Sequence, residues 1–433
     1  MKKFFLTIFA ALCCTVMANA EDFIVNGIKY YVTGTDPNTV EVIANEDKYS
    51  GDIVIPATVI NGETEYSVTR IGNNAFKWCS LNSVSLPEGL QSIGEFAFTS
   101  CGIIGSLTIP STVTDIGEYA FNYCTLTSVT LLKGQEGLIK NIGHYAFLQC
   151  SNLQSVSLPE GVQSIGSEAF SICPNLQSVS LPEGLQSIGG DAFFKSGITG
   201  ELTIPSSVTN IESGAFKECT SLTSVTLRKG QEGLIKTIGD GAFSGCSSLQ
   251  SVSLPEGLQS IGNDTFFGCS DLQFVSLPEG LQSIGENAFR TSGITGTLTI
   301  PSTMTSIGKN AFINTGGLNE ILVYSDNMTT IGEGVWSNSI PTYVTGKSFD
   351  KYRSGIFQNY NVKLLPGADN LGDAIKNLAN LSDAEADAVK SFLKVLNTMG
   401  TKQEGPAVVV TKGEQSVTLY GPDNVKFIKT EEK

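Results

Sequence analysis

The sequence predicts a mainly-β repeat solenoid of about twelve 23-residue coils, with an N-terminal β cap and a small C-terminal α+β module. Three observations lead to this fold class. An Ile-Gly-x-x-Ala-Phe box recurs along the chain, most copies follow one another by 23 residues, and short strand-like runs lie between them. Because a single unit cannot bury its own apolar side chains, the units must stack into one continuous core.

Residues 1–20 are interpreted as a secretory signal peptide. An apolar run follows two lysines, and Ala-Asn-Ala forms a small-residue cleavage site after Ala20. Cys13 and Cys14 leave a lipoprotein anchor open, although the residues before them are bulky. No later stretch has the ~18 consecutive apolar residues of a membrane helix. We therefore expect a secreted or cell-surface protein with no transmembrane span.

Residues 21–66 predict the N-terminal β cap. Apolar and polar residues alternate over 28–32, 40–43 and 53–55, which is typical of strands with one buried face. A solenoid needs such strands because the edge of its first coil is otherwise unpaired.

Residues 67–345 predict the solenoid itself. Val156 and Leu158 flank a serine, so the run from Ser155 to Leu158 is expected to form a strand, which Pro159 ends. The box begins at twelve isoleucines: Ile71, Ile93, Ile116, Ile142, Ile165, Ile188, Ile211, Ile238, Ile261, Ile284, Ile307 and, in degenerate form, Ile331.

Two further segments complete the predicted layout. Residues 346–366 are expected to form an irregular closing coil, and 367–433 the α+β module. The module has a helical pattern with a capping box at Ser382 and Glu385, followed by three strand-like runs. It contains no recognisable motif, so docking on the solenoid, attachment to the envelope and partner binding all remain open.

The repeat pattern Leu-x-x-Val-x-Leu-Pro-x-x-Leu-x-x-Ile-Gly-x-x-Ala-Phe-x-x-Cys resembles that of the BspA-like, Treponema-type leucine-rich repeat family of bacterial surface proteins. The resemblance covers about residues 66–345, and the segment that begins at Phe23 is similar to the cap that precedes such repeats. It implies an extended ligand-binding solenoid, with adhesion to host matrix proteins or to other bacteria as the associated activity.

Eight cysteines each stand eight residues after the first residue of their box. Exported chains normally pair their cysteines, but neighbours here would lie ~5 Å apart with parallel side chains, a direction that opposes a disulfide. Ser196 and Ser292 also take the same slot in two coils. We expect buried free thiols, with disulfides as the alternative, at Cys79, Cys101, Cys124, Cys150, Cys173, Cys219, Cys246 and Cys269.

The candidate contacts are four aromatic residues. The fourth position of the box is aromatic in three successive coils, as Phe96, Tyr119 and Tyr145. If these rings face outward they form a stripe that could hold a sugar or a protein, and otherwise they cover a groove between coils. Phe274 interrupts a line of small hydroxylated residues on the strand face and is the fourth candidate.

Composition excludes several function classes. The 433 residues include 27 basic and 42 acidic side chains, a net charge of -15 that argues against a nucleic-acid partner. His144 is the only histidine, which removes most catalytic and metal-binding constellations. We predict a non-enzymatic protein without metal or cofactor that binds an extracellular protein or glycan. The alternative is a structural scaffold or surface-layer spacer whose C-terminal module binds.

Overall fold

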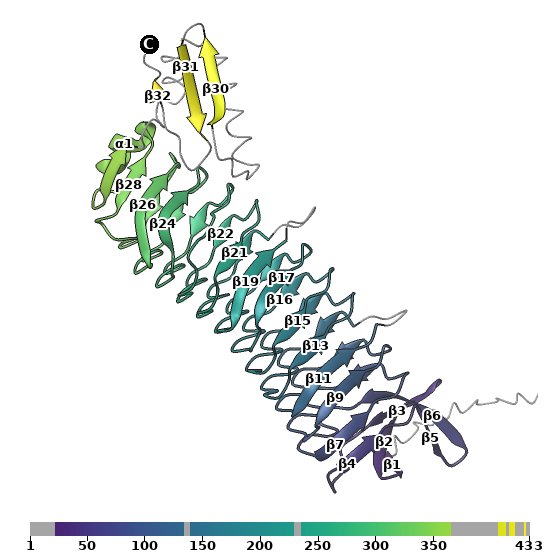
Figure 1. Ribbon diagram of the computed structural model, residues 1–433. Coiled ribbons are helices and arrows are strands. Elements are labelled where there is room, and N and C mark those ends of the chain that lie inside the picture. The colour runs from purple at the N-terminus through teal and green to yellow at the C-terminus, as the bar shows by residue number, and fades with distance from the viewer. Residues whose placement is uncertain are drawn as a thin grey trace, which may run out of the picture. The chain divides into compact units, whose positions relative to one another are not determined.

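The computed structural model describes residues 22–133, 139–228, 235–364, 406–412, 415–420 and 428–429 (Figure 1). The predicted mainly-β solenoid is confirmed, with about twelve turns. The chain divides into two compact units, Met1–Ile198 and Thr199–Lys433. Each unit is described by itself below.

The first unit begins with six strands, which pair into hairpins and then join the first coils. β1 and β2 pair antiparallel, as do β5 and β6, whereas β6 runs parallel to β8 and β4 parallel to β7. The N-terminal strands therefore continue into the hydrogen bonding of the coils. The six are β1 (Asp22–Val25), β2 (Ile28–Thr35), β3 (Asn38–Val42), β4 (Ser50–Val54), β5 (Thr58–Asn61) and β6 (Thr64–Ile71).

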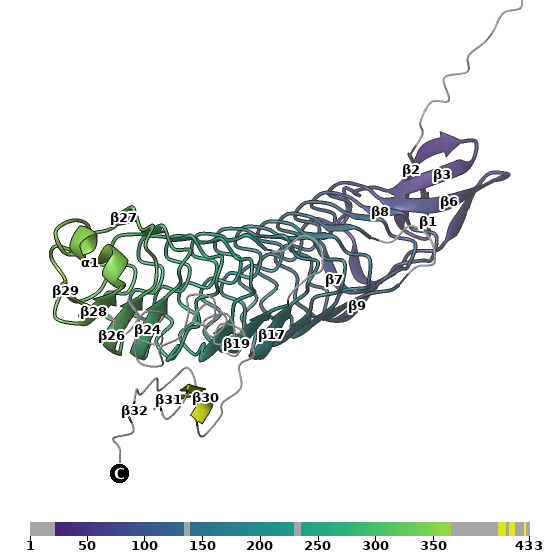
Figure 2. The ribbon, with the colours of Figure 1, turned by 90° about the horizontal axis from the view of Figure 1, so that it is seen from above.

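Each following coil of the first unit contributes one longer strand and one two-residue strand that contains the box isoleucine. Figure 2 shows these two lines of strands on opposite sides of the coils. The longer strands are β7 (Ser80–Ser85), β9 (Gly105–Ile109), β11 (Leu126–Leu131), β13 (Ser155–Ser157) and β15 (Ser178–Ser180). The short ones are β8 (Ser92–Ile93), β10 (Asp115–Ile116), β12 (Asn141–Ile142), β14 (Ser164–Ile165) and β16 (Ser187–Ile188).

The second unit repeats this arrangement. Its longer strands are β17 (Gly200–Ile204), β19 (Leu222–Leu227), β21 (Ser251–Ser253), β24 (Thr295–Ile300), β26 (Gly317–Val323), β28 (Pro341–Val344) and β29 (Asn361–Leu364). Its short strands are β18 (Asn210–Ile211), β20 (Thr237–Ile238), β22 (Ser260–Ile261), β23 (Ser283–Ile284), β25 (Ser306–Ile307) and β27 (Thr330–Ile331). The short strands pair parallel and in register, so Ser260 lies beside Ser283 and Ile261 beside Ile284.

Residues 346–364 contain regular elements in place of the irregular coil that we expected. Helix α1 (Gly346–Arg353) precedes β29, which pairs parallel with β28. The eight-residue helix is too short to show a helical period in the sequence. Asp326 holds its N-terminal end: the carboxylate accepts hydrogen bonds from Thr345 and from Ser348 at 2.7 Å, and Lys347 lies 3.3 Å away.

The C-terminal strands β30 (Pro406–Lys412), β31 (Gln415–Tyr420) and β32 (Ile428–Lys429) form a three-stranded antiparallel sheet. The helices that we expect before them lie outside the described residues.

The core of each unit is a ladder of box phenylalanines. In the first unit the rings of successive coils stack from Phe76 to Phe193 with centroids 4.9 to 5.4 Å apart. In the second unit the ladder runs from Phe216 to Phe312 and ends against Trp336. Each stacked pair stabilises the fold by ~1 kcal/mol beyond its buried area.

The cysteines form a second internal ladder, and the prediction of buried free thiols is confirmed for all eight. A thiol donates to the carbonyl of the box phenylalanine in the preceding coil, as Cys124 does to Phe98 at 3.1 Å and Cys269 to Phe243 at 3.3 Å. Burial is the main cause that raises the pKa of thiols in this ladder, for Cys173 and Cys269 to about 12.

Candidate binding surface

The fourth position of the box has a left-handed backbone. The φ angles of Phe96, Tyr119 and Tyr145 are 55°, 56° and 59°. Asparagine, aspartate and glycine tolerate this conformation and occupy the slot in most other coils, whereas a bulky side chain there is an outlier that costs ~1–2 kcal/mol. Three consecutive coils therefore carry rings where local sterics disfavour them, which is a feature of functional surfaces.

The three rings stack on one another along the coils. The centroids of Phe96 and Tyr119 lie 4.8 Å apart and those of Tyr119 and Tyr145 4.4 Å apart, with interplanar angles of 4° in both pairs. The Lys77 ammonium lies 4.3 Å from the Phe96 ring centroid. All three rings are half-buried. Both faces of Tyr119 are therefore covered, and the outer edge of the stack is what a ligand can contact.

Two further exposed aromatic residues lie in these turns, and the sequence alone did not identify them. Trp78 and Tyr123 are 65% and 55% exposed and lie in the same turn segments of their coils as the box residues. They occupy a second left-handed slot, with φ angles of 61° and 56°. Both residues occupy the variable position directly before a ladder cysteine, and this shared position could have identified them in the sequence. We define the aromatic surface as Trp78, Phe96, Tyr119, Tyr123 and Tyr145.

The aromatic surface has opposite charges at its two ends. Lys77 lies 4.7 Å and Lys48 6.0 Å from the Trp78 ring centroid. At the other end, Glu168 and Asp191 follow Tyr145 in the fourth box position of the next two coils. Burial and, next, the charge of Asp191 raise the pKa of the Glu168 carboxyl.

Carboxylates also affect the pKa of Tyr119, which lies in the middle of the aromatic surface. Burial first, then the Tyr145 hydroxyl and the carboxylates of Glu168 and Glu118, raise the pKa of Tyr119. His144 is exposed beside Tyr145, and its Nδ1 accepts a hydrogen bond of 2.9 Å from the backbone N–H of Ser167. The histidine thus links two coils, a structural role that explains its place in the turn.

Phe274 belongs to the second unit and to a different line of positions. Its side chain is 66% exposed, and it stands where the preceding coil has Ser251. It is not among the rings that stack in the first unit, so it stays a separate candidate contact.

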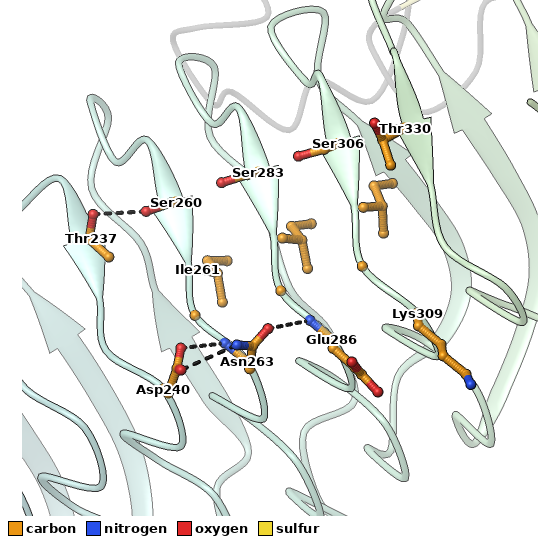
Figure 3. A pocket seen from close by; sticks show the side chains of 15 residues that line it. Thr237, Asp240, Ser260, Ile261, Asn263, Ser283, Glu286, Ser306, Lys309 and Thr330 are labelled. Atoms are coloured by element: carbon orange, nitrogen blue, oxygen red, sulfur yellow. Dashed lines mark hydrogen bonds between the residues drawn. The ribbon is translucent and has the colours of Figure 1, made fainter.

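A shallow hollow of about 500 Å³ lies along the short strands β20 to β27 of the second unit (Figure 3). Several of its polar groups form hydrogen bonds from one coil to the next. Ser260 donates to Thr237 at 2.8 Å, and the backbone N–H groups of Asn263 and Glu286 donate to Asp240 and Asn263, each at 2.7 Å. These hydrogen bonds join successive coils, which indicates a role in coil stacking.

Other kinds of site find no support in the part of the chain that the structure describes. There, no three His, Cys, Asp or Glu side chains gather as metal ligands. Within the same residues, no helix is long and apolar enough to cross a bilayer.

Comparisons with known proteins agree with this architecture. A family model described as BspA type leucine-rich repeat region, in six copies, matches residues 69–196, 140–235 and 236–363. No curated protein matches the chain.

Three solved structures illustrate the similarity. The pneumococcal vaccine antigen PcpA is 19% identical with a TM-score of 0.50, over 80% of this chain and 99% of that one. A leucine-rich repeat protein from Bacteroides ovatus is 23% identical with a TM-score of 0.46, over 80% and 100%. A leucine-rich cell surface protein from Faecalibacterium prausnitzii is 25% identical with a TM-score of 0.38, over 70% and 94%.

Proposed function

Because the chain belongs to the BspA-type leucine-rich repeat family, we propose that it is an exported, adhesin-like binding protein that holds an extracellular partner on the aromatic surface. The observation that carries this proposal is the set of five aromatic residues in left-handed slots, a conformation that Asn, Asp or Gly would adopt at lower cost. Large rings supply much contact area for little loss of side-chain entropy, which suits them to binding.

Binding rather than catalysis suits the chemistry of this surface. It offers ring edges, phenol hydroxyls and charged ends, all on turns of a rigid stack of coils. Repeat proteins use such laterally extended surfaces to hold partners.

Export is the second part of the proposal. Residues 1–20, with the cleavage site after Ala20, lie outside the described residues, so the support for secretion or surface display is the sequence pattern and the family. The mass of the protein recovered from the native cells tests this: loss of 20 residues supports export, and an intact N-terminus in the cytoplasm contradicts it.

The test of the binding surface is an array of extracellular matrix proteins, bacterial surface proteins and glycans, probed with the mature protein. The triple variant Phe96→Ala, Tyr119→Ala, Tyr145→Ala is compared with Tyr324→Ala, a change at an exposed ring of the second unit that is not a candidate contact. We expect the triple variant alone to lose array hits while circular dichroism shows it folded. Hits that survive the triple variant contradict the proposed surface.

A second candidate function is a scaffold whose C-terminal module binds. The observation that favours it is the sheet β30–β31–β32, whose strands pair only with one another among the described residues. Deletion of residues 367–433 separates the two functions. Retained array hits support the aromatic surface, and lost hits support the module.

A further inference from the structure

We infer that the aromatic surface binds an extended segment of a partner protein that is acidic at one end, apolar in the middle and basic at the other. This inference rests on the proposed function and names the class of partner.

The basic end consists of two lysines beside one exposed indole. Lys48 and Lys77 both lie close to the Trp78 ring, and the Lys48 ammonium donates to the Lys77 carbonyl at 3.3 Å. Within the described residues neither lysine is in an ion pair. A carboxylate that approaches Trp78 is thus attracted by two ammonium groups.

The acidic end consists of two neighbouring carboxylates. Glu168 and Asp191 occupy equivalent slots in adjacent coils, and among the described side chains no lysine or arginine pairs with either. Their mutual repulsion contributes to the raised pKa of the Glu168 carboxyl. A cationic side chain placed between them removes that repulsion.

The middle of the surface favours a peptide over a sugar. A sugar ring packs on the face of an aromatic ring, but Tyr119 is covered on both faces by its neighbours and Phe96 on one face by Lys77. The outer edges of the stack and the exposed Trp78 and Tyr123 remain for contact. Apolar side chains of a peptide can pack against these edges.

The length of the surface fits a short extended segment. Lys77 and Glu168 are four coils apart, a distance of ~19 Å at the inter-strand spacing of ~4.8 Å. An extended chain advances ~3.3 Å per residue, so about six residues separate the acidic from the basic end of the ligand.

The experiment is selection from a displayed random decapeptide library on the immobilised mature protein. Two charge-swap variants are selected in parallel: Lys48→Glu with Lys77→Glu, and Glu168→Lys with Asp191→Lys. Lys363→Glu, an exposed change in the second unit, is the matched control. Circular dichroism and thermal unfolding check that every variant is folded.

We expect the unmodified protein to enrich peptides with acidic and basic ends about six residues apart. The first swap changes the preference at the acidic end of the peptide only, and the second at the basic end only. Each swap weakens binding of the originally selected peptide by about tenfold, and Lys363→Glu leaves it unchanged. Enriched peptides without charge polarity, a swap that alters neither end, or no enrichment at all overturns the inference.

The array experiment distinguishes failure of this inference from failure of the proposed function. If the ring triple variant abolishes a glycan hit while no polar peptide is selected, the surface binds but the partner class named here is wrong. If the triple variant changes no hit, the proposed function itself fails.

Discussion

Replacement of Ser292 by cysteine should stabilise the second unit. Ser292 is 3% exposed and occupies the slot that a thiol fills in the coils before it. Its hydroxyl is buried without a hydrogen-bond partner. The longer cysteine side chain reaches the preceding carbonyl in equivalent coils, as Cys246 does to Phe216 at 3.2 Å and Cys269 to Phe243 at 3.3 Å.

The magnitude follows from the unpaired hydroxyl. A buried polar group without a partner costs about 1–3 kcal/mol, and a cysteine behaves there as a small apolar residue with a weak donor. We expect Ser292→Cys to raise the free energy of unfolding by ~1 kcal/mol and the melting temperature by ~2–4 °C. Cys269→Ser, the reverse change one coil earlier, should lower both by a similar amount.

Thermal unfolding of the full chain, followed by circular dichroism under reducing conditions, measures these shifts. Ser292→Ala separates the two effects because it removes the hydroxyl and adds no volume. Should Ser292→Cys destabilise the protein while Ser292→Ala does not, the slot is too small for sulfur and the assumed equivalence of the coils is wrong. Destabilisation by both variants would refute the claim that the hydroxyl is unpaired.

Three further predictions concern the core and the end of the solenoid. Gly285→Ala should lower the free energy of unfolding by ~3 kcal/mol, because the added Cβ would lie 2.5 Å from backbone atoms of the preceding coil. Gly317→Ala should be tolerated, because the nearest atom to its Cβ is 3.7 Å away. Urea titration of both variants measures the difference. All eight cysteines should resist alkylation at pH 8 in the folded protein and react after denaturation, because all eight are buried and burial raises the pKa of thiols such as Cys173 and Cys269; rapid alkylation of the native protein would contradict the ladder. Burial alone would raise the pKa of Asp326, but hydrogen bonds from Thr345, Ser348 and Lys347 lower it overall. Its stabilising contribution is therefore complete above the unfolded pKa of ~3.9 and is lost as pH falls through the lower folded value. Hydrogen exchange of α1 should speed up over that range, and Asp326→Asn should remove this pH dependence.

Much of the fold was predictable because the same residue pattern recurs in successive coils. The period placed the strand at Ser155, and the shared slot of eight cysteines and two serines indicated thiols without disulfides. Helix α1 was missed because a single short helix has no second copy to reveal its pattern.

The candidate surface was only partly predictable. The sequence identified Phe96, Tyr119 and Tyr145 as a line of residues, but backbone conformation leaves no trace in hydrophobic periodicity. The left-handed slots became visible only with φ angles, and with them Trp78 and Tyr123. From the sequence alone the rings could either face outward or cover a groove, and the structure shows half-buried rings that stack from coil to coil.

The parallel register from coil to coil affects how a gene of this kind can change by recombination. Because Ser164 lies beside Ser187 and Ile165 beside Ile188, loss or gain of one complete 23-residue unit preserves every internal ladder. The same event moves surface residues on either side of the new junction by one coil, ~4.8 Å. Unequal crossing-over can therefore lengthen or shorten the distance between two surface features in fixed steps, without new point mutations in the core.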